Sequence, residues 1–191
     1  MRTSIQSPSK ISLEEFLLLP ETEPANEYID GQIYQKAMPQ GKHSTLQIKF
    51  SSAINQVGKP QKLAFAFPEL RCSFGGCAVV PDLAVFEWSR IPLNSQGEIE
   101  NRFEMAPDWI IEILAPDQSS TRVINKILFC LKNKTQLGWL IDPEERLVLV
   151  FQPQQEPEAK ENQDILPVLD VLSGLQMSAA DLFGLLSFDR S

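Results

Sequence analysis

Apolar residues recur every three or four positions in several segments of the chain, a spacing that predicts amphipathic helices. The longest of these patterns includes Leu46 and Ile54 and stops at Gly58, a residue type that commonly ends a helix. Ser12 and Glu15 form a capping-box pattern that predicts the start of another helix. We expect helices over residues 13–19, residues 46–57, residues 119–133 and residues 179–185.

Short apolar runs bounded by turn residues predict the strands of the fold. Asp30 and Gly31 lie between two such runs and form a two-residue hairpin signal. The expected strands cover residues 27–29, 32–34, 63–67, 70–74, 78–86, 108–114, 137–142 and 147–151. Residues 90–107 are polar and irregular, so we expect a loop there. This order of elements predicts an α/β or α+β fold in which helices flank a mixed central β-sheet.

The chain has 191 residues, of which 43% are hydrophobic and 22% charged, a composition typical of a globular domain. We expect a single domain over residues 1–191, with a helical N-terminal extension over residues 1–25 and a polar insertion loop over residues 152–164. No apolar stretch reaches the roughly 20 residues of a membrane-spanning helix, so a membrane partner is not expected. The N-terminus lacks a secretory pattern and the chain has three cysteines, which favours a cytoplasmic location.

The net charge is −8, but many basic residues are concentrated in two segments that contain no acidic residue. Residues 31–68 contain five lysines, and residues 118–141 contain four lysines or arginines. A locally basic surface can bind phosphate groups even on an acidic protein. Ordinary solvent-exposed helix faces explain the same pattern equally well.

Two carboxylates lie within apolar runs that predict strands. Alternation places Asp82 on the same strand face as Val80 and Ala84, and it places Glu112 on one face with Ile110. An ionised carboxylate on such a face needs a partner, because removing it from water is costly. Two carboxylates on neighbouring strands favour a hard divalent cation such as Mg²⁺, and a buried salt bridge is the alternative.

The predicted helix that follows the second carboxylate carries two basic residues on one side. Lys126 falls at the border between the apolar arc of this helix and its solvent face, and Arg122 lies one turn earlier on the same side. The two side chains can therefore address one anion. A lysine whose stem covers apolar surface is the alternative interpretation.

The ordered set of motifs resembles the PD-(D/E)xK nuclease superfamily, and it is most similar to its Uma-type restriction endonuclease branch. The resemblance covers most of the chain. It is carried by Glu27-Tyr28-Ile29-Asp30-Gly31, His43, Val80-Pro81-Asp82, Ile111-Glu112-Ile113-Leu114-Ala115-Pro116, Lys126 and Trp139-Leu140-Ile141-Asp142-Pro143. The resemblance implies a Mg²⁺-dependent endonuclease that hydrolyses phosphodiester bonds in DNA.

The resemblance also implies roles for individual residues. Asp82, Glu112 and the carbonyl of Ile113 would hold Mg²⁺, with Mn²⁺ as a substitute. Glu27 would complete the metal shell, and Lys126 would orient or deprotonate the attacking water. The expected contacts to phosphate or DNA come from Arg122, His43 and Lys42.

Alternatives remain for two of these residues and for the function as a whole. Glu27 also fits a hairpin acid in solvent, and His43 fits an imidazole at the edge of the core. A second function is an inactive nuclease-fold module that binds nucleic acid or a protein partner. The acidic net charge favours this module, and so do departures from the family pattern at Asn125, Cys130 and Lys134.

The lysine of the superfamily follows its acid by two positions, and Leu114 stands there in this chain. Lys126 matches the place from which the Uma-type branch supplies its amine. Because Asp82, Glu112 and Lys126 are all retained, the endonuclease is the favoured function.

Two further interpretations concern cysteines and partners. The three cysteines Cys72, Cys77 and Cys130 lack the paired spacing typical of zinc ligands, so neither a zinc site nor a Cys–His hydrolase is expected. DNA is the expected partner. A homodimer would use residues 90–107 or the edge strand near Leu147.

Overall fold

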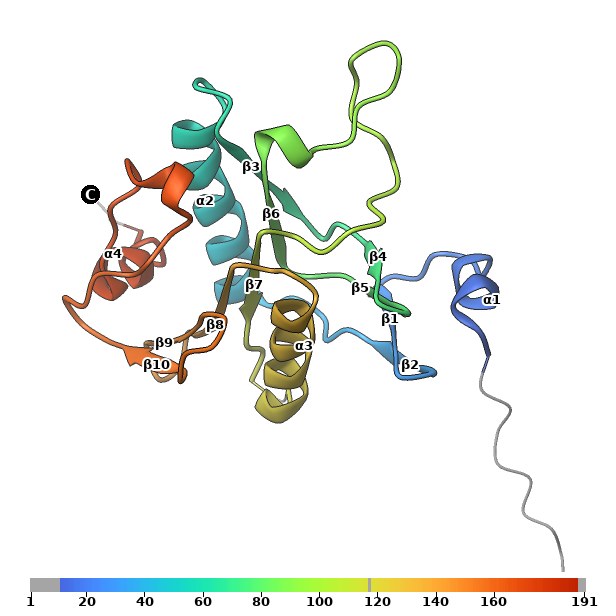
Figure 1. Ribbon diagram of the computed structural model, residues 1–191. Coiled ribbons are helices and arrows are strands. Elements are labelled where there is room, and N and C mark those ends of the chain that lie inside the picture. Colours follow the sequence, from blue (N-terminus) through green and yellow to red (C-terminus); the bar gives the residue numbers. More distant parts are fainter. Residues whose placement is uncertain (1–10, 117, 189–191) are drawn as a thin grey trace, which may run out of the picture.

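Two β-sheets form the centre of the computed structural model, which describes residues 11–116 and 118–188 (Figure 1). The larger sheet has the strand order β10 (Glu158–Lys160), β9 (Leu147–Phe151), β8 (Leu137–Asp142), β7 (Trp109–Ile113), β6 (Leu83–Glu87) and β3 (Ala64–Pro68). The smaller sheet has the order β2 (Gln32–Gln35), β1 (Asn26–Ile29), β5 (Cys77–Val79) and β4 (Cys72–Phe74).

Helices surround these sheets. The α-helices of the described residues are α1 (Leu13–Leu17), α2 (Gly41–Gly58), α3 (Ser120–Lys132) and α4 (Ala179–Gly184), and two short 3-10 helices are η1 (Trp88–Arg90) and η2 (Asp170–Leu172). None of the helices within the described ranges combines the length and the apolar character needed to cross a membrane.

The β7–α3–β8 unit gives the larger sheet its mixed character. β7 and β8 pair in parallel, from Trp109 opposite Leu137 to Ile113 opposite Ile141. The other strand pairs in the described part of the chain are antiparallel. Helix α3 is the crossover between the two parallel strands, as such a connection requires. The predicted architecture, a mixed β-sheet flanked by helices in an α/β or α+β fold, is confirmed.

Helices α2 and α3 lie on opposite faces of the larger sheet (Figure 1). Leu46, Phe50 and Ile54 of α2 are fully buried in one core cluster, which also includes residues of η2 and α4. Val123 and Ile127 of α3 belong to a second cluster on the other face. Each helix therefore buries the apolar stripe that its sequence pattern predicts.

A glycine in β8 allows α3 to approach the sheet closely. A Cβ atom at Gly138 would lie 2.4 Å from Cγ2 of Ile127, a distance that real Cβ atoms do not show. Because Lys126 precedes Ile127 in α3, this close approach also brings Lys126 against the sheet, where its residue is only 4% exposed.

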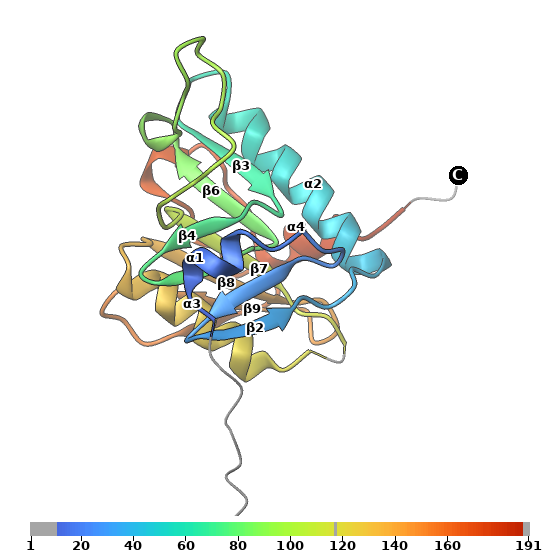
Figure 2. The same cartoon turned by 90° about the vertical axis from the view of Figure 1, so that its right-hand side faces the viewer.

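Helix α1 and the β1–β2 hairpin lie on one side of the larger sheet, the side that faces the viewer in Figure 2. Phe16 of α1 packs with Tyr28 and Ala78 of the smaller sheet. The predicted capping box is present, because Glu15 N donates to Ser12 Oγ at 3.1 Å and Ser12 N donates to Glu15 Oε2 at 2.7 Å.

Several predicted boundaries are wrong. The expected strand at 78–86 is divided into β5 and β6, which belong to different sheets, and Asp82 lies in the connection just before β6. Pro81 explains the break, because proline has no backbone N–H to donate within a sheet. The expected strand at 70–74 begins only at Cys72, and the expected helix at 13–19 ends at Leu17.

The predicted insertion loop at 152–164 contains a strand. β10 pairs with β9, with Ala159 opposite Leu149. The strand near Leu147 is therefore not an edge strand, which corrects that part of the expected dimer surface. Residues 1–10 of the expected N-terminal extension lie outside the described residues, and the single-domain organisation stays a prediction.

Candidate active site

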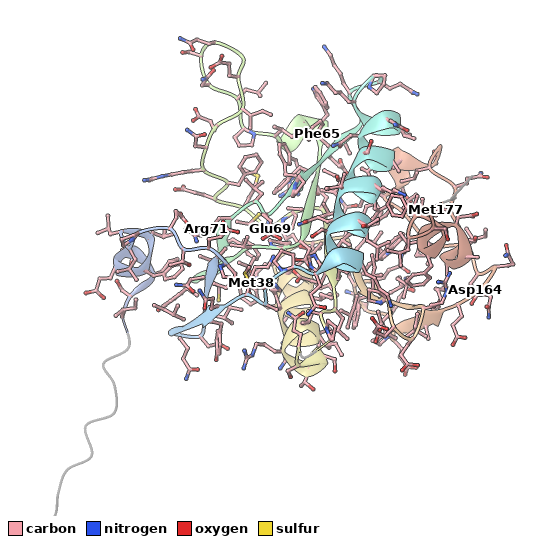
Figure 3. The ribbon with its side chains drawn as sticks, turned by 180° about the vertical axis from the view of Figure 1, so that it is seen from behind. Met38, Phe65, Glu69, Arg71, Asp164 and Met177 are labelled. Carbon is pink, nitrogen blue, oxygen red and sulfur yellow. The ribbon has the colours of Figure 1, made fainter. Side chains whose placement is uncertain are left out.

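A group of charged side chains meets where the smaller sheet faces the ends of β6 and β7. We call it the carboxylate–lysine cluster, and it consists of Glu27 of β1, Lys36 after β2, Glu69 after β3, Asp82 before β6, Glu112 of β7 and Lys126 of α3. Figure 3 shows Glu69 near the middle of the molecule, beside α2. Asp82, Glu112 and Lys126 are all less than 5% exposed, whereas the side chain of Glu69 is 43% exposed and lies at the solvent edge of the cluster.

Asp82 is held through both of its carboxylate oxygens. Lys36 Nζ donates to Oδ1 at 2.7 Å, and His43 Nε2 lies 3.1 Å from Oδ2. The backbone N–H of Ile113 also donates to Oδ2, at 2.7 Å. Burial alone would raise the pKa of Asp82, but Lys36 and His43 together hold that pKa below its usual value, so the carboxyl stays ionised.

Glu112 and Glu27 share the ammonium group of Lys126. Lys126 Nζ lies 2.8 Å from Glu112 Oε2 and donates to Glu27 Oε1 at 2.9 Å. The N–H of Val80 donates to the same Glu27 oxygen at 2.8 Å, which fixes this acid from a second side. The other oxygen of Glu112, Oε1, is buried without a hydrogen-bond partner among the described residues.

Burial and the neighbouring charges shift the pKa values of Glu112 and Lys126 in opposite directions. Burial raises the pKa of Glu112 to about 8, although Lys126 opposes the shift. Burial alone would lower the pKa of Lys126, but Glu112, Glu27 and Asp82 raise that pKa above its usual value. Lys126 is therefore a permanent cation, whereas Glu112 is the carboxyl with the least compensation in the cluster.

Lys36 and Gln47 complete the network around Asp82. Lys36 Nζ also donates to Glu69 Oε2 at 2.8 Å, so this ammonium group bridges two carboxylates. Gln47 Nε2 donates to Glu69 Oε1 and to the backbone carbonyl of Asp82, both at 2.9 Å. The side chain of Lys36 is only 9% exposed.

The structure brings together five of the predicted site residues: Asp82, Glu112, Lys126, Glu27 and His43. Two expectations about their environment are wrong. Lys126 is buried and does not lie at the border with solvent, and Glu27, at 7% exposure, is not a hairpin acid in solvent. The glycine at position 138 explains the first difference, and the ion pair with Lys126 explains the second.

Ile113, the predicted carbonyl ligand, lies directly beside Asp82. Its N–H points at Asp82, and the next N–H, that of Leu114, donates to Ile141 on the opposite side at 2.8 Å. Because the N–H and C=O of one strand residue point to the same side, the Ile113 carbonyl lies on the edge of β7 that faces Asp82.

The other two predicted DNA contacts lie outside the cluster. The exposed Arg122 places its guanidinium 4.7 Å from the centre of the Tyr34 ring. Lys42, in the first turn of α2, donates to both oxygens of Glu144 at 2.9 Å. A pocket of about 190 Å³ lies at this helix start and is lined by Gln40, Gly41, Lys42, His43, Leu114, Pro116, Pro143 and Glu144.

Sequence reasoning missed Lys36, Gln47 and Glu69 as members of the site. Lys36 follows a hairpin strand and Glu69 follows β3, positions at which charged residues normally face solvent. The only sequence signal for Lys36 is that it belongs to the long segment 31–68, which contains no acidic residue and so offers this lysine no local partner.

The oxygen donors of the cluster fit a hard divalent cation. Within the described residues, no group of three His, Cys, Asp or Glu side chains is arranged to hold a metal ion, and Lys36 and Lys126 form ion pairs with the carboxylates. The unpartnered Glu112 Oε1 nevertheless offers a free buried donor. Carboxylate and carbonyl oxygens are the ligands that Mg²⁺ and Mn²⁺ prefer.

The departures from the family pattern do not enter the cluster. Asn125 is exposed on α3, and Cys130 is fully buried in the core cluster below this helix. Lys134 follows α3 with a φ of 79°, the left-handed conformation that favours the glycine expected there. No hydrogen bond or ion pair within the described ranges joins the side chain of any of the three to the cluster.

The mixed sheet with its β7–α3–β8 crossover, and the two carboxylates buried at adjacent strands, define a protein of the restriction-endonuclease-like class. A model of the Uma2 family, described as "Putative restriction endonuclease", matches residues 13–180. The chain therefore belongs to the Uma2 family.

A solved structure supports the same assignment. The chain is similar to a protein from Anabaena variabilis ATCC 29413 whose crystal structure, at 1.96 Å resolution, is described as that of a "putative nuclease belonging to DUF820". The two are 58% identical, the match covers 93% of this chain and 99% of the other, and the TM-score is 0.91. The comparison with curated proteins found no match.

Proposed function

We propose that this chain is a Mg²⁺-dependent DNA endonuclease whose reaction takes place at the carboxylate–lysine cluster. The observation that carries the proposal is the buried group of Asp82, Glu112 and Lys126, in which Asp82 directly precedes β6, Glu112 lies in the adjacent strand β7 and the lysine lies 2.8 Å from Glu112. Membership of the Uma2 family and the likeness to the Anabaena protein support nuclease activity.

The proposed metal ligands are Asp82, Glu112 and the carbonyl of Ile113. A divalent cation bound there would supply Lewis-acid activation of the scissile phosphate and of the attacking water. His43 and the N–H of Ile113 keep Asp82 Oδ2 in a fixed orientation, and Glu112 offers the buried oxygen that lacks a partner. The same site would accept Mn²⁺, which prefers the same oxygen donors.

Lys126 acts in this proposal as a cation and not as a general base. Its pKa is raised by Glu112 and Glu27, so the amine keeps its proton at neutral pH. An ammonium group held in a site sheltered from bulk solvent can orient the attacking water and stabilise the negative charge that develops on the phosphate. Glu27 directs Lys126, and its remaining oxygen is the expected additional metal ligand.

The DNA backbone would approach from the start of α2. The pocket of about 190 Å³ there is lined by Lys42 and by His43, which also contacts Asp82. Free N–H groups at a helix start and a lysine favour a phosphate group. Arg122 lies on the exposed face of α3, from which it would contact a more distant phosphate.

Plasmid nicking tests the proposal. Wild-type protein should convert supercoiled plasmid to the nicked form with Mg²⁺ or Mn²⁺ and not with EDTA. Asp82→Ala and Glu112→Gln should each reduce the rate by a factor of about 100 or more, the range expected when an electrostatic contact to the reacting group is lost. Glu100→Gln, an exposed acid in the 90–107 loop, is the matched control and should cleave like the wild type.

Two results would contradict the endonuclease. Equal cleavage by the wild type, Asp82→Ala and Glu112→Gln would show that a contaminating nuclease is responsible. A well-folded wild type that cleaves neither double-stranded nor single-stranded DNA would point to the alternative, a nuclease-fold module that only binds nucleic acid or a protein.

A further inference from the structure

Two lysines of the cluster have the same relation to the carboxylates. Lys126 Nζ lies between Glu27 and Glu112, at 2.9 Å and 2.8 Å. Lys36 Nζ lies between Asp82 and Glu69, at 2.7 Å and 2.8 Å. The resemblance to known nucleases assigns a role to Lys126 only, so the second bridging lysine needs an explanation of its own.

The ammonium group of Lys36 is buried and held between two carboxylates. The side chain of this lysine is 9% exposed, and both of its carboxylate partners are fixed independently. His43 and the N–H of Ile113 hold Asp82, and Gln47 holds Glu69. A lysine that merely covers apolar surface would keep its ammonium group in water, and Lys36 does not.

A charge count shows what this ammonium group achieves. With Glu112 ionised as a metal ligand, four carboxylates and two ammonium groups leave a surplus of two negative charges, which one divalent cation at Glu112 and Asp82 would balance. Without Lys36 the surplus would be three, and Asp82 Oδ1 and the half-exposed Glu69 would lose the ammonium group that lies between them. Such a pair of acids, one of them shared, is the arrangement that a second metal ion occupies in two-metal nucleases.

We propose that the ammonium group of Lys36 replaces a second metal ion between Asp82 and Glu69, so that the chain binds one divalent cation. The inference rests on the proposed nuclease function, because it takes Asp82 and Glu112 as the ligands of that cation. Lys36 is then a fixed positive charge beside Asp82 that does not depend on metal binding. It positions Asp82, and with it in place the site needs only one divalent cation.

Counting bound Mn²⁺ tests this inference directly. Equilibrium titration with detection of free Mn²⁺ by electron paramagnetic resonance should give one ion per wild-type chain. Lys36→Ala removes the built-in cation and should bind two ions, with a spectrum that shows spin coupling, because ions in two-metal sites lie about 4 Å apart. The double variant Lys36→Ala with Glu69→Gln should return to one ion.

Two controls make the result specific. Lys160→Ala removes a lysine that pairs with Glu158 outside the cluster, and it should still bind one ion. If Lys36→Ala does not fold, as judged by circular dichroism, Lys36→Asn serves instead, because a short amide fills part of the space and is itself a possible ligand. It should also bind two ions.

Each remaining outcome is decisive. Two ions on the wild type, or one ion on folded Lys36→Ala or Lys36→Asn, would overturn the inference about Lys36 while leaving the nuclease proposal intact. No ion on the wild type, together with no plasmid nicking, would instead overturn the proposed function. If Lys36→Ala binds a second ion without spin coupling, the two ions lie far apart. This result would also contradict the inference that Lys36 substitutes for a second metal ion.

Discussion

Replacing Glu112 with glutamine should make the metal-free protein more stable at alkaline pH, although it removes a proposed metal ligand. Burial raises the pKa of Glu112 to about 8, from an ordinary value of 4.5. Lys126 and Lys36 oppose this shift, whereas Asp82 and Glu27 add to it. In the absence of a cation, the ionised form of Glu112 therefore has a high free energy in the folded chain.

The direction of the pH effect follows from proton binding. Between about pH 4.5 and pH 8 the folded chain keeps Glu112 protonated while the unfolded chain has released that proton, so the free energy of unfolding falls as the pH rises. Each pH unit well inside this window corresponds to about 1.4 kcal/mol, so Glu112 should lower the stability by about 2 kcal/mol between pH 6 and pH 8, where it is already half ionised. Glutamine resembles the protonated acid at every pH and should not show this loss.

Urea denaturation in EDTA, followed by tryptophan fluorescence at pH 6, 7, 8 and 9, measures this difference. The stability of Glu112→Gln relative to the wild type should increase across the series by about 3 kcal/mol and level off above pH 8. Glu100→Gln, an exposed control, should follow the wild type at every pH. Mg²⁺ added at pH 8 should stabilise the wild type more than Glu112→Gln, because a neutral amide binds the cation more weakly than a carboxylate does.

Parallel curves of stability against pH for the wild type and Glu112→Gln would contradict this role of Glu112. If the wild type and Glu112→Gln lose stability equally between pH 6 and pH 8, other groups cause the pH dependence and Glu112 is not the uncompensated acid. A gain from Mg²⁺ of the same size in both proteins would place the cation elsewhere.

Three further predictions concern positions around the site. Gly138→Ala should lower the melting temperature, at a cost of about 2 kcal/mol, because the added methyl group collides with α3; an unchanged melting temperature would show that α3 can move away freely. Lys134→Gly should stabilise the chain by about 1 kcal/mol in urea denaturation by removing a strained positive φ, and a loss of stability would contradict this. Glu144→Gln frees Lys42 and should tighten DNA binding, as measured by fluorescence anisotropy. The slope of log affinity against log salt concentration (the salt slope) should become steeper by about 1. Glu145→Gln, in the same turn but lining a different pocket, should change the salt slope less, and equal slopes would exclude a specific role for Lys42.

Local sequence patterns were sufficient to predict the elements whose structure depends on residues that are near in the sequence. The capping box of Ser12 and Glu15 forms as predicted, and the expected strands at 137–142 and 147–151 coincide with β8 and β9. The two buried carboxylates were also recognisable, because an acid inside an apolar run conflicts with its surroundings and such conflicts are expected at functional sites.

The features of the site that the sequence did not reveal depend on contacts between segments far apart in the chain. Lys36 and Asp82 are 46 positions apart, and no local pattern indicates that the end of a hairpin strand will close over the start of β6. The burial of Lys126 depended on a glycine in another strand, Gly138, whose role becomes visible only when α3 is placed on the sheet. The division of the strand at Pro81 could have been predicted, since proline interrupts the hydrogen bonding of a sheet.

The arrangement of the ion pairs links the chemistry of the site to the assembly of the fold. Lys36 and Glu27 belong to the β1–β2 hairpin of the smaller sheet, whereas their partners Asp82 and Lys126 belong to the larger sheet and its crossover helix. Each of these buried pairs therefore joins the two sheets, and breaking one by removing a single partner leaves an uncompensated charge at a cost of about 3–5 kcal/mol. The buried ion pairs that flank Glu112 thus also hold the hairpin in the position from which Glu27 directs Lys126.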